Sequence, residues 1–201
     1  MKTKIPQLLI IFRLLLGPTM IYLTYRFKSE IRLELVILII LGLLSDVFDG
    51  IIARITGTSS EKLRRMDSQT DLVFWICVGF CSWLLNPEII LENKIPIAII
   101  FTMEALTYVF SFAKFGKETC THALLSKLWG LSLLATFVGL IGFGYAGFTF
   151  LSAIFFGVIG HIDVYLIILF LPKWTHDVPS CYHAYLIKKR IPIQRNKLLN
   201  G

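Results

Sequence analysis

The chain has 201 residues, of which 56% are hydrophobic and 16% charged, and its formal net charge is +7. A soluble domain of this length carries about a quarter of charged residues, so the composition excludes an ordinary soluble domain and favours a membrane protein. The basic residues lie between and after apolar stretches, so the positive charge indicates mainly the orientation of the chain in the membrane, and no nucleic acid is expected.

Six apolar stretches are each long enough for a transmembrane helix, which needs about 20 residues. We expect spans at residues 6–25, 33–56, 68–86, 95–113, 124–144 and 148–172. These spans use most of the chain, which predicts a single all-α membrane domain over residues 1–201 with a tail from residue 173. The first stretch has a basic start, but no small-residue cleavage site follows it, so we expect a retained helix.

The distribution of basic residues predicts that both termini are cytoplasmic. With six spans and an internal N-terminus, four of the 20 Lys and Arg residues fall outside, namely Arg26, Lys28, Arg32 and Lys94. This asymmetry fits the positive-inside rule. The tail stretch HDVPSCYHAYLIKKR is typical of a short amphipathic segment on the anionic inner surface. We therefore expect an integral protein of the cytoplasmic membrane.

Four of the six aspartates gather in one segment, SDVFDGIIARITGTSSEKLRRMDSQTD, residues 45–71. Asp46 and Asp49 are three residues apart at the end of the second span and share one helix face. Asp67 and Asp71 are four residues apart and share a face where the third span begins. The polar loop that we expect between these spans, residues 56–66, would bring the two faces together at the inner membrane boundary.

Clustered carboxylates inside a membrane need cations, because a lone aspartate there costs about 2.5 to 3.5 kcal/mol and like charges repel. Hard oxygen ligands suit Mg²⁺, Ca²⁺ or Mn²⁺, and a cluster without His or Cys argues against zinc. Two metal ions on shared carboxylates suit chemistry on a phosphate. Helix capping could explain Asp67, but it does not explain Asp46 and Asp49, which follow a long apolar run.

Small residues continue the face of the first aspartate pair. Gly50, Ala53 and Gly57 form a strip with almost no side chain. Such a strip either packs closely on another helix or lets a ligand lie against the backbone. Arg54 lies next to the strip near the inner surface, where it can neutralise one carboxylate.

The segment resembles the signature of the CDP-alcohol phosphotransferases, D-x2-D-G-x2-A-R-x8-G-x3-D-x3-D. The fixed positions of this pattern correspond, with every spacing kept, to Asp46, Asp49, Gly50, Ala53, Arg54, Leu63, Asp67 and Asp71. Seven of these eight residues agree with the pattern. The exception is Leu63, because the family has a glycine there that lies close to the nucleotide. The six-span architecture is also similar to that of the family.

The resemblance implies an integral membrane enzyme that moves a substituted phosphate from a CDP-linked donor, usually CDP-diacylglycerol, to an alcohol acceptor and releases CMP. By position, the four aspartates would hold two divalent metal ions, Mg²⁺ or Mn²⁺, and Asp71 would also be the general base. Gly50 and Ala53 would leave room for the nucleotide, and Arg54 would pair with an acid or with the donor's phosphates. Relatives form homodimers, so a homodimer is expected.

The acceptor is less well defined by the sequence. The opening IPQLLIIFRLLLGP resembles the P-N-x-L-T-x-x-R-x4-P start of phosphatidylglycerophosphate synthases at Pro6, Arg13 and Pro18, which favours glycerol-3-phosphate. An arginine within a span is costly, so Arg13 should face the site or reach the inner surface. Lys127 and His122 are further candidates for the acceptor site, and ordinary positive-inside charge explains them equally well. Inositol phosphate, serine and a second lipid are alternative acceptors.

Two other functions compete with this interpretation. An intramembrane prenyltransferase also binds Mg²⁺ through aspartate pairs, but its acidic motifs lie far apart in sequence, whereas Asp49 and Asp67 are 18 residues apart. A divalent-cation transporter often has inverted repeats and helices broken at the midplane, and the sequence contains no repeat. CDP or CMP with Mg²⁺ or Mn²⁺ should stabilise the enzyme and leave a transporter unaffected.

Three further polar residues lie in the middle of predicted spans: Glu104 in the fourth, and His161 and Asp163 in the sixth. They could pair with one another, line a cavity or lie near a dimer interface. For His161 we expect structural hydrogen bonding.

Overall fold

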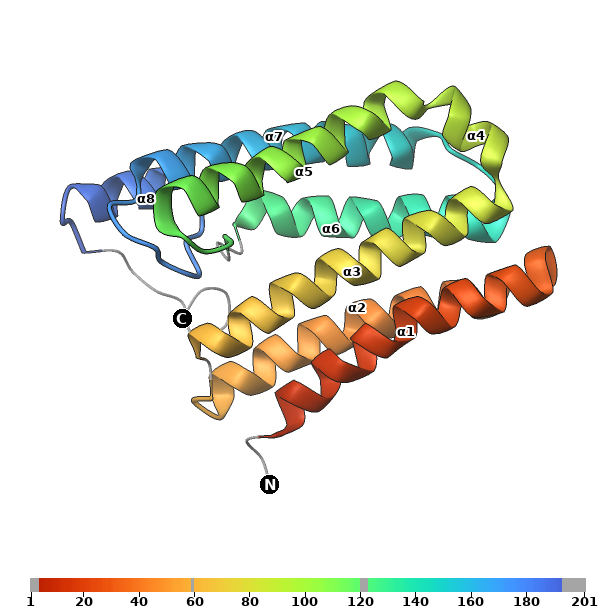
Figure 1. The fold of residues 1–201 in the computed structure, drawn as a ribbon, viewed down its shortest axis with the longest axis horizontal. Coiled ribbons are helices and arrows are strands. Elements are labelled where there is room, and N and C mark those ends of the chain that lie inside the picture. Colours follow the sequence, from red (N-terminus) through yellow and green to blue (C-terminus); the bar gives the residue numbers. More distant parts are fainter. Residues whose placement is uncertain (1–3, 59, 120–122, 193–201) are drawn as a thin grey trace. The chain divides into compact units, whose positions relative to one another are not determined.

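The computed structural model describes residues 4–58, 60–119 and 123–192. Over these ranges the chain folds into helices joined by short connections, with no strand (Figure 1). The helices are α1 (Ile5–Phe27), a 3₁₀ turn η2 (Lys28–Ile31), α2 (Arg32–Ile55), α3 (Glu61–Leu85), α4 (Pro87–Glu92), α5 (Lys94–Phe115), α6 (Leu124–Phe137), a π-helical segment η3 (Val138–Gly142), α7 (Phe148–Phe170) and α8 (Cys181–Lys188).

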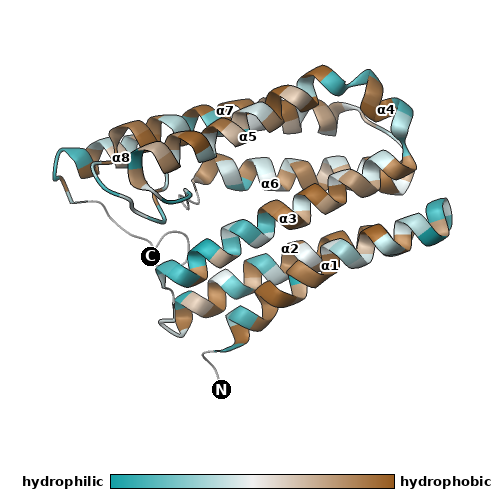
Figure 2. Ribbon diagram, viewed as in Figure 1, coloured by the Kyte–Doolittle hydropathy of each residue, from teal (hydrophilic) through white to brown (hydrophobic). Residues whose placement is uncertain are grey.

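Five helical stretches of the described chain are long and apolar enough to cross a membrane: Ile5–Ile55, Glu61–Leu85, Lys94–Phe115, Leu124–Gly142 and Phe148–Phe170. The first of them contains two helices, α1 and α2, joined by η2. Hydrophobic residues dominate these stretches, whereas the first turns of α3 are hydrophilic (Figure 2). The prediction of an all-α membrane protein is confirmed, and six spans with cytoplasmic termini stay a prediction.

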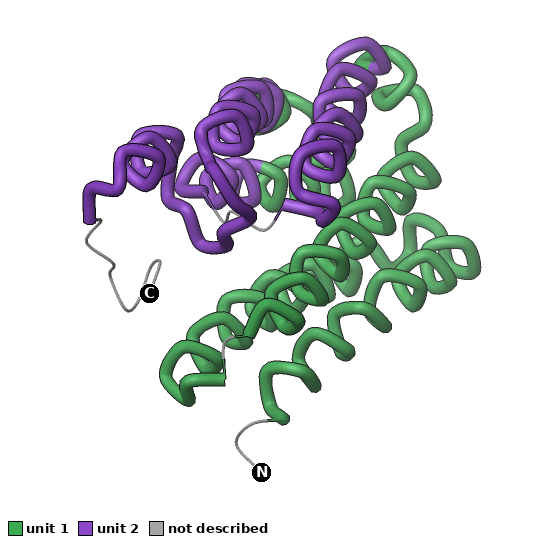
Figure 3. The backbone as a smooth tube through the Cα atoms, turned by 60° about the vertical axis from the view of Figure 1, so that its left-hand side comes forward, with its two compact units in different colours: residues 1–93, 133–150 green, residues 94–132, 151–201 purple. Residues whose placement is uncertain are grey.

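The chain forms two compact units (Figure 3). One unit comprises Met1–Asn93 and Leu133–Phe150, and the other comprises Lys94–Ser132 and Leu151–Gly201. The first unit therefore contains α1, α2 and α3 together with all four aspartates of the signature segment. The single domain expected over residues 1–201 stays a prediction.

In the first unit, α1 packs against both α2 and α3. Its buried residues recur every three or four positions, as they do on one face of a helix. Two glycines allow this close packing. A Cβ atom at Gly17 of α1 would lie 2.9 Å from the Sγ atom of Cys77, and one at Gly42 of α2 would lie 2.2 Å from the ring of Phe74. The core between the helices comprises Leu16, Met20, Leu35, Ile39, Phe74, Val78, Cys81 and Ile141.

One arginine ties the helix ends together at the end of the first unit where α2 begins. Arg32 donates through Nη1 to the carbonyl of Ile141 at 2.7 Å and through Nη2 to Oδ1 of Asn86 at 3.1 Å. Asn86 in turn donates to the carbonyl of Leu140 at 2.8 Å. Asp46 lies 14 residues further along α2, about 21 Å at 1.5 Å per residue, so this clamp is remote from the aspartates.

The connection between α2 and α3 is shorter than the sequence analysis predicts. The expected loop at 56–66 was wrong in its second half, because α3 begins at Glu61. The Oγ atom of Ser60 accepts a hydrogen bond from the backbone N–H of Leu63 at 3.2 Å, which caps the helix early. Leu63 and Arg64 therefore occupy the first turn of a helix, and their side chains have fixed directions.

The second unit contains the three polar residues that were expected inside spans. Nε2 of His161 on α7 lies 2.8 Å from Oε2 of Glu104 on α5, and its Nδ1 lies 2.6 Å from the carbonyl of Gly157. His161 thus has the structural hydrogen bonds that we expected. Asp163 has a different partner, because its Oδ1 accepts from the backbone N–H of Cys181 at 2.9 Å and so anchors the start of α8.

Candidate metal centre

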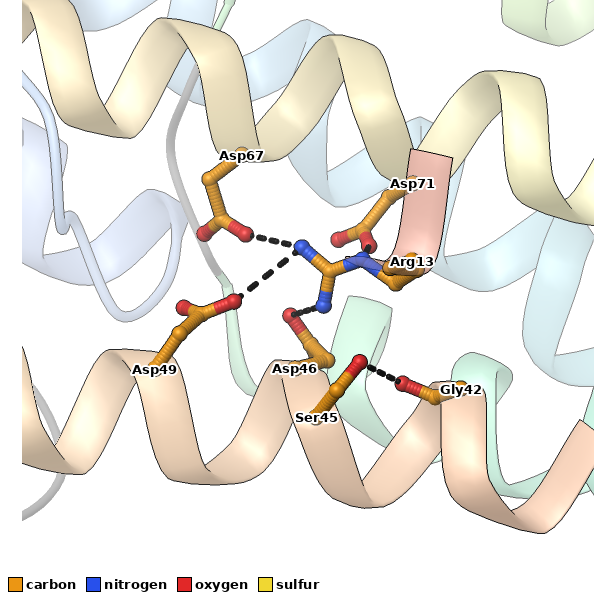
Figure 4. Close-up of polar contacts among 7 residues, drawn as sticks. All are labelled: Arg13, Gly42, Ser45, Asp46, Asp49, Asp67 and Asp71. Carbon is orange, nitrogen blue, oxygen red and sulfur yellow. Dashed lines mark hydrogen bonds and ion pairs between the residues drawn. The ribbon is translucent and has the colours of Figure 1, made fainter. Parts of the chain in front are cut away.

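The site is built from side chains on three helices of the first unit. Asp46 and Asp49 come from α2, Asp67 and Asp71 from α3, and Arg13 from α1 (Figure 4). Each aspartate pair has the three- or four-residue spacing that places both members on one helix face. The faces of α2 and α3 meet across the Arg13 side chain, so the convergence that the sequence predicts is present in the structure.

Arg13 lies at the centre of the four carboxylates, and only 1% of its surface is exposed. Its Nη1 lies 2.7 Å from Oδ1 of Asp46, and its Nε lies 3.0 Å from Oδ1 of Asp71. Its Nη2 lies 2.5 Å from Oδ1 of Asp67 and 3.3 Å from Oδ2 of Asp49. The guanidinium therefore forms ion pairs with all four carboxylates, and its Nη2 donates a hydrogen bond to Oδ1 of Asp67. Of the two positions expected for Arg13, the structure has the one that faces the site.

The cluster has a closed side and an open side. The side chains of Asp49 and Asp67 are only 4% and 5% exposed, whereas those of Asp46 and Asp71 are 34% and 30% exposed. A molecule that approaches from outside the helices would therefore meet Asp46 and Asp71 first. By exposure, the buried Asp49 and Asp67 are suited to hold a cation, whereas the more exposed Asp46 and Asp71 can also contact a substrate.

The carboxylates fit a divalent metal ion by position and by chemistry. Among the described residues, Asp46, Asp49 and Asp67 each offer an oxygen, and these oxygens lie within 4.8 Å of one another. Oxygen ligands at about 2.0 to 2.6 Å from a common ion have such separations. In addition, Oδ2 of Asp49 is buried and accepts no hydrogen bond, which leaves it suited to a cation. Asp71 lies outside this group of three.

The small-residue strip beside the aspartates is covered in part, since no atom lies within 4 Å of a Cβ atom placed at Gly57. A Cβ atom at Gly50 would lie 3.4 Å from Nη1 of Arg54. Ala53 is 2% exposed and packs in a small cluster with Ile10 of α1 and Leu63 of α3. Ala53 therefore packs closely between helices, whereas Gly50 lies beside Arg54 of its own helix and Gly57 is open. A role of Gly50, Ala53 and Arg54 in nucleotide binding stays a prediction.

Two other residues were expected at the acceptor site, Lys127 and His122. Lys127 is an exposed residue of α6 in the second unit, and His122 lies outside the described residues. The sequence analysis missed Arg64, which is 4% exposed in the first turn of α3 and interacts electrostatically with Asp49. Its position three residues before Asp67 is the signal that could have found it, because this spacing places both on one helix face.

Comparison with known proteins adds one match. A family model described as CDP-alcohol phosphatidyltransferase matches residues 3–171. No curated protein and no solved structure matches the chain. The matched residues run from α1 to the end of α7 and include the whole of the candidate metal centre.

Proposed function

The chain belongs to the CDP-alcohol phosphatidyltransferase family of membrane transferases for phospholipid synthesis, and we propose that it transfers a phosphatidyl group from CDP-diacylglycerol to glycerol-3-phosphate and releases CMP. Membership supports the transfer from a CDP-alcohol to an acceptor, whereas this donor and this acceptor are our proposal. The observation that carries the proposal is the meeting of four aspartates from α2 and α3 around one point.

The aspartates supply the oxygen ligands that pyrophosphate chemistry requires. Asp46, Asp49, Asp67 and Asp71 would hold two divalent ions, Mg²⁺ or Mn²⁺, which when bound polarise the pyrophosphate and offset the charge on departing CMP. Asp49 and Asp67, the two buried members, are kept from water by the helices around them. Their helical backbones hold the carboxylates in place, so little reorganisation is needed during the reaction.

Asp71 is the proposed general base. Its side chain is 30% exposed on the open side of the cluster, and its Oδ1 forms an ion pair with Nε of Arg13 at 3.0 Å. An acceptor hydroxyl can therefore reach a carboxylate whose orientation is already set. A base within hydrogen-bond distance takes the hydroxyl proton as the oxygen attacks phosphorus, and such catalysis contributes about 10²- to 10⁴-fold to the rate.

The remaining proposals concern the nucleotide, the acyl chains and the acceptor. Gly50, Ala53 and Arg54 are proposed to contact the nucleotide, with the acyl chains of the donor in the bilayer and the site facing the cytoplasm. Arg13 and Lys127 are the described residues proposed for a phosphorylated acceptor. If the acceptor is instead inositol phosphate, serine or a second lipid, its hydroxyl group would need the same general base. We further propose a homodimer.

The test is CMP release by purified protein with CDP-diacylglycerol and Mn²⁺, one acceptor at a time. We expect release with glycerol-3-phosphate, and release with another acceptor alone would overturn this assignment. If no acceptor supports release and neither CDP nor CMP stabilises the protein in Mn²⁺, the enzyme proposal fails in favour of a transporter.

Asp71→Asn tests the base directly. Asn has the shape of Asp but no charge and cannot act as a base, so we expect a folded protein whose CMP release falls by about 10²-fold or more. Ser45→Ala is the matched control. The Ser45 hydroxyl is close to the cluster but donates to the carbonyl of Gly42 in its own helix, at 2.6 Å (Figure 4). This variant should keep its activity. Full activity of Asp71→Asn would contradict the mechanism.

A further inference from the structure

The guanidinium of Arg13 and a divalent cation would use the same carboxylates. The three aspartates whose oxygens lie within 4.8 Å of one another are Asp46, Asp49 and Asp67. Arg13 contacts all three, at 2.7, 3.3 and 2.5 Å. A guanidinium and a metal ion that share these three carboxylates repel each other as like charges, so each weakens the binding of the other.

We infer that Arg13 is an internal cation that holds the four aspartates together in the metal-free protein and competes with metal ions for them. This inference rests on the metal site of the proposed function. It assigns Arg13 a positioning role, which precedes any contact with substrate. When a metal ion binds, the guanidinium gives up contacts to Asp46, Asp49 and Asp67.

The charges of the site explain why such a residue is needed. Four carboxylates from two helices repel one another, and Asp49 and Asp67 have almost no access to water. Charged groups inside a membrane protein are costly unless they are paired. Arg13 contacts all four carboxylates from α1 and so stabilises the packing of α1 against α2 and α3. Arg13 together with Arg64, which interacts electrostatically with Asp49, supplies fewer positive charges than the four carboxylates carry, so the site keeps an attraction for divalent cations.

The packing of α1 confines the movement to the Arg13 side chain. Gly17, one turn after Arg13, lies against Cys77. Met20, about two turns after Arg13, is fully buried in the core. These contacts hold the helix backbone in place. The long, flexible side chain of Arg13 can therefore move away from the carboxylates without a shift of α1.

Competition and simple structural support predict opposite effects on metal affinity. If metal binding breaks contacts of Arg13, then Arg13 lowers the metal affinity by the same coupling free energy, because linkage between two binding events is reciprocal. Removing the guanidinium must then tighten metal binding while it destabilises the metal-free protein. If Arg13 only maintains the geometry of the site, its removal weakens metal binding.

The experiment is a titration of Arg13→Met with Mn²⁺, in which electron paramagnetic resonance measures free Mn²⁺ and thermal unfolding is followed with and without the ion. Met keeps an unbranched apolar side chain and removes the charge. We expect a Tm below that of the wild type without metal, and a Kd for Mn²⁺ lower by about 5- to 150-fold, the usual range of such coupling. Mn²⁺ should accordingly raise the Tm of the variant more than that of the wild type.

Arg32→Met is the matched control. Arg32 is also an arginine with several partners in the first unit, but these partners are backbone carbonyls and Asn86. We expect this variant to lose the same amount of stability with and without Mn²⁺ and to keep the Kd of the wild type. A change in Kd in Arg32→Met would show that general loosening of the helices affects metal binding, which would overturn the inference.

A second measurement covers the case in which Arg13→Met does not fold. In wild-type protein labelled with ¹⁵N-arginine, the Nε–H resonance of Arg13, assigned with Arg13→Lys, should shift as Mg²⁺ is added. An unshifted resonance at saturating Mg²⁺, or a Kd in Arg13→Met equal to or weaker than that of the wild type, overturns the inference and leaves the proposed function intact. Failure of the wild type to bind Mn²⁺ at all overturns both.

Discussion

Leu63→Gly tests the one position at which the chain departs from the family signature. Leu63 is 7% exposed and packs against Ile10 of α1 and Ala53 of α2. Its side chain therefore fills a space between three helices that the family's glycine would leave open. Substitution by glycine removes this packing while the backbone N–H of residue 63 can still donate to Ser60.

The loss of stability follows from two contributions. Truncating a buried leucine to alanine costs about 2 to 5 kcal/mol, and glycine in place of alanine in a helix costs about 1 kcal/mol more. We therefore expect the free energy of unfolding to fall by about 3 to 6 kcal/mol. At about 2 to 4 °C per kcal/mol for a chain of this size, the Tm falls by about 6 to 24 °C.

The assay is thermal unfolding in detergent, with Leu63→Met as the control that conserves volume and should cost less than about 1.5 kcal/mol. CMP release gives an independent readout, because opening the space beside Ala53 should lower the KM for the CDP-linked donor if the nucleotide lies there. Equal Tm values for Leu63→Gly and Leu63→Met would refute the packing argument. An unchanged KM would refute the placement of the nucleotide next to Ala53.

Two further predictions follow from close contacts outside the aspartate cluster. Gly42→Ala places a Cβ atom 2.2 Å from Cζ of Phe74, so the free energy of unfolding should fall by about 1 to 3 kcal/mol; a higher Tm would contradict this. Burial raises the pKa of the Cys181 thiol, and Asp163 raises it further. Asp163→Ala should lower that pKa, increase the reactive thiolate at pH 8 and speed maleimide labelling of Cys181, as located by mass spectrometry. An unchanged labelling rate would argue against this anchor of α8.

Local spacing accounts for what the sequence analysis predicted well. The long apolar stretches and the aspartate pairs depend on helix geometry, in which residues three and four apart share a face. A short connection between two such helices then brings Asp46 and Asp49 close to Asp67 and Asp71. The start of α3 is harder to predict, because the capping residue Ser60 lies in a segment that is polar throughout.

The sequence by itself therefore determined the membrane class, the family signature and the four converging carboxylates, since each depends on composition or on neighbours within a few residues. Only the tertiary structure decided that Arg13 occupies their centre, 54 residues from Asp67 in the chain, and that Asp163 anchors α8 while His161 pairs with Glu104. Such partners depend on which helix faces meet. That choice is made by the packing of whole helices around residues such as Gly17 and Gly42.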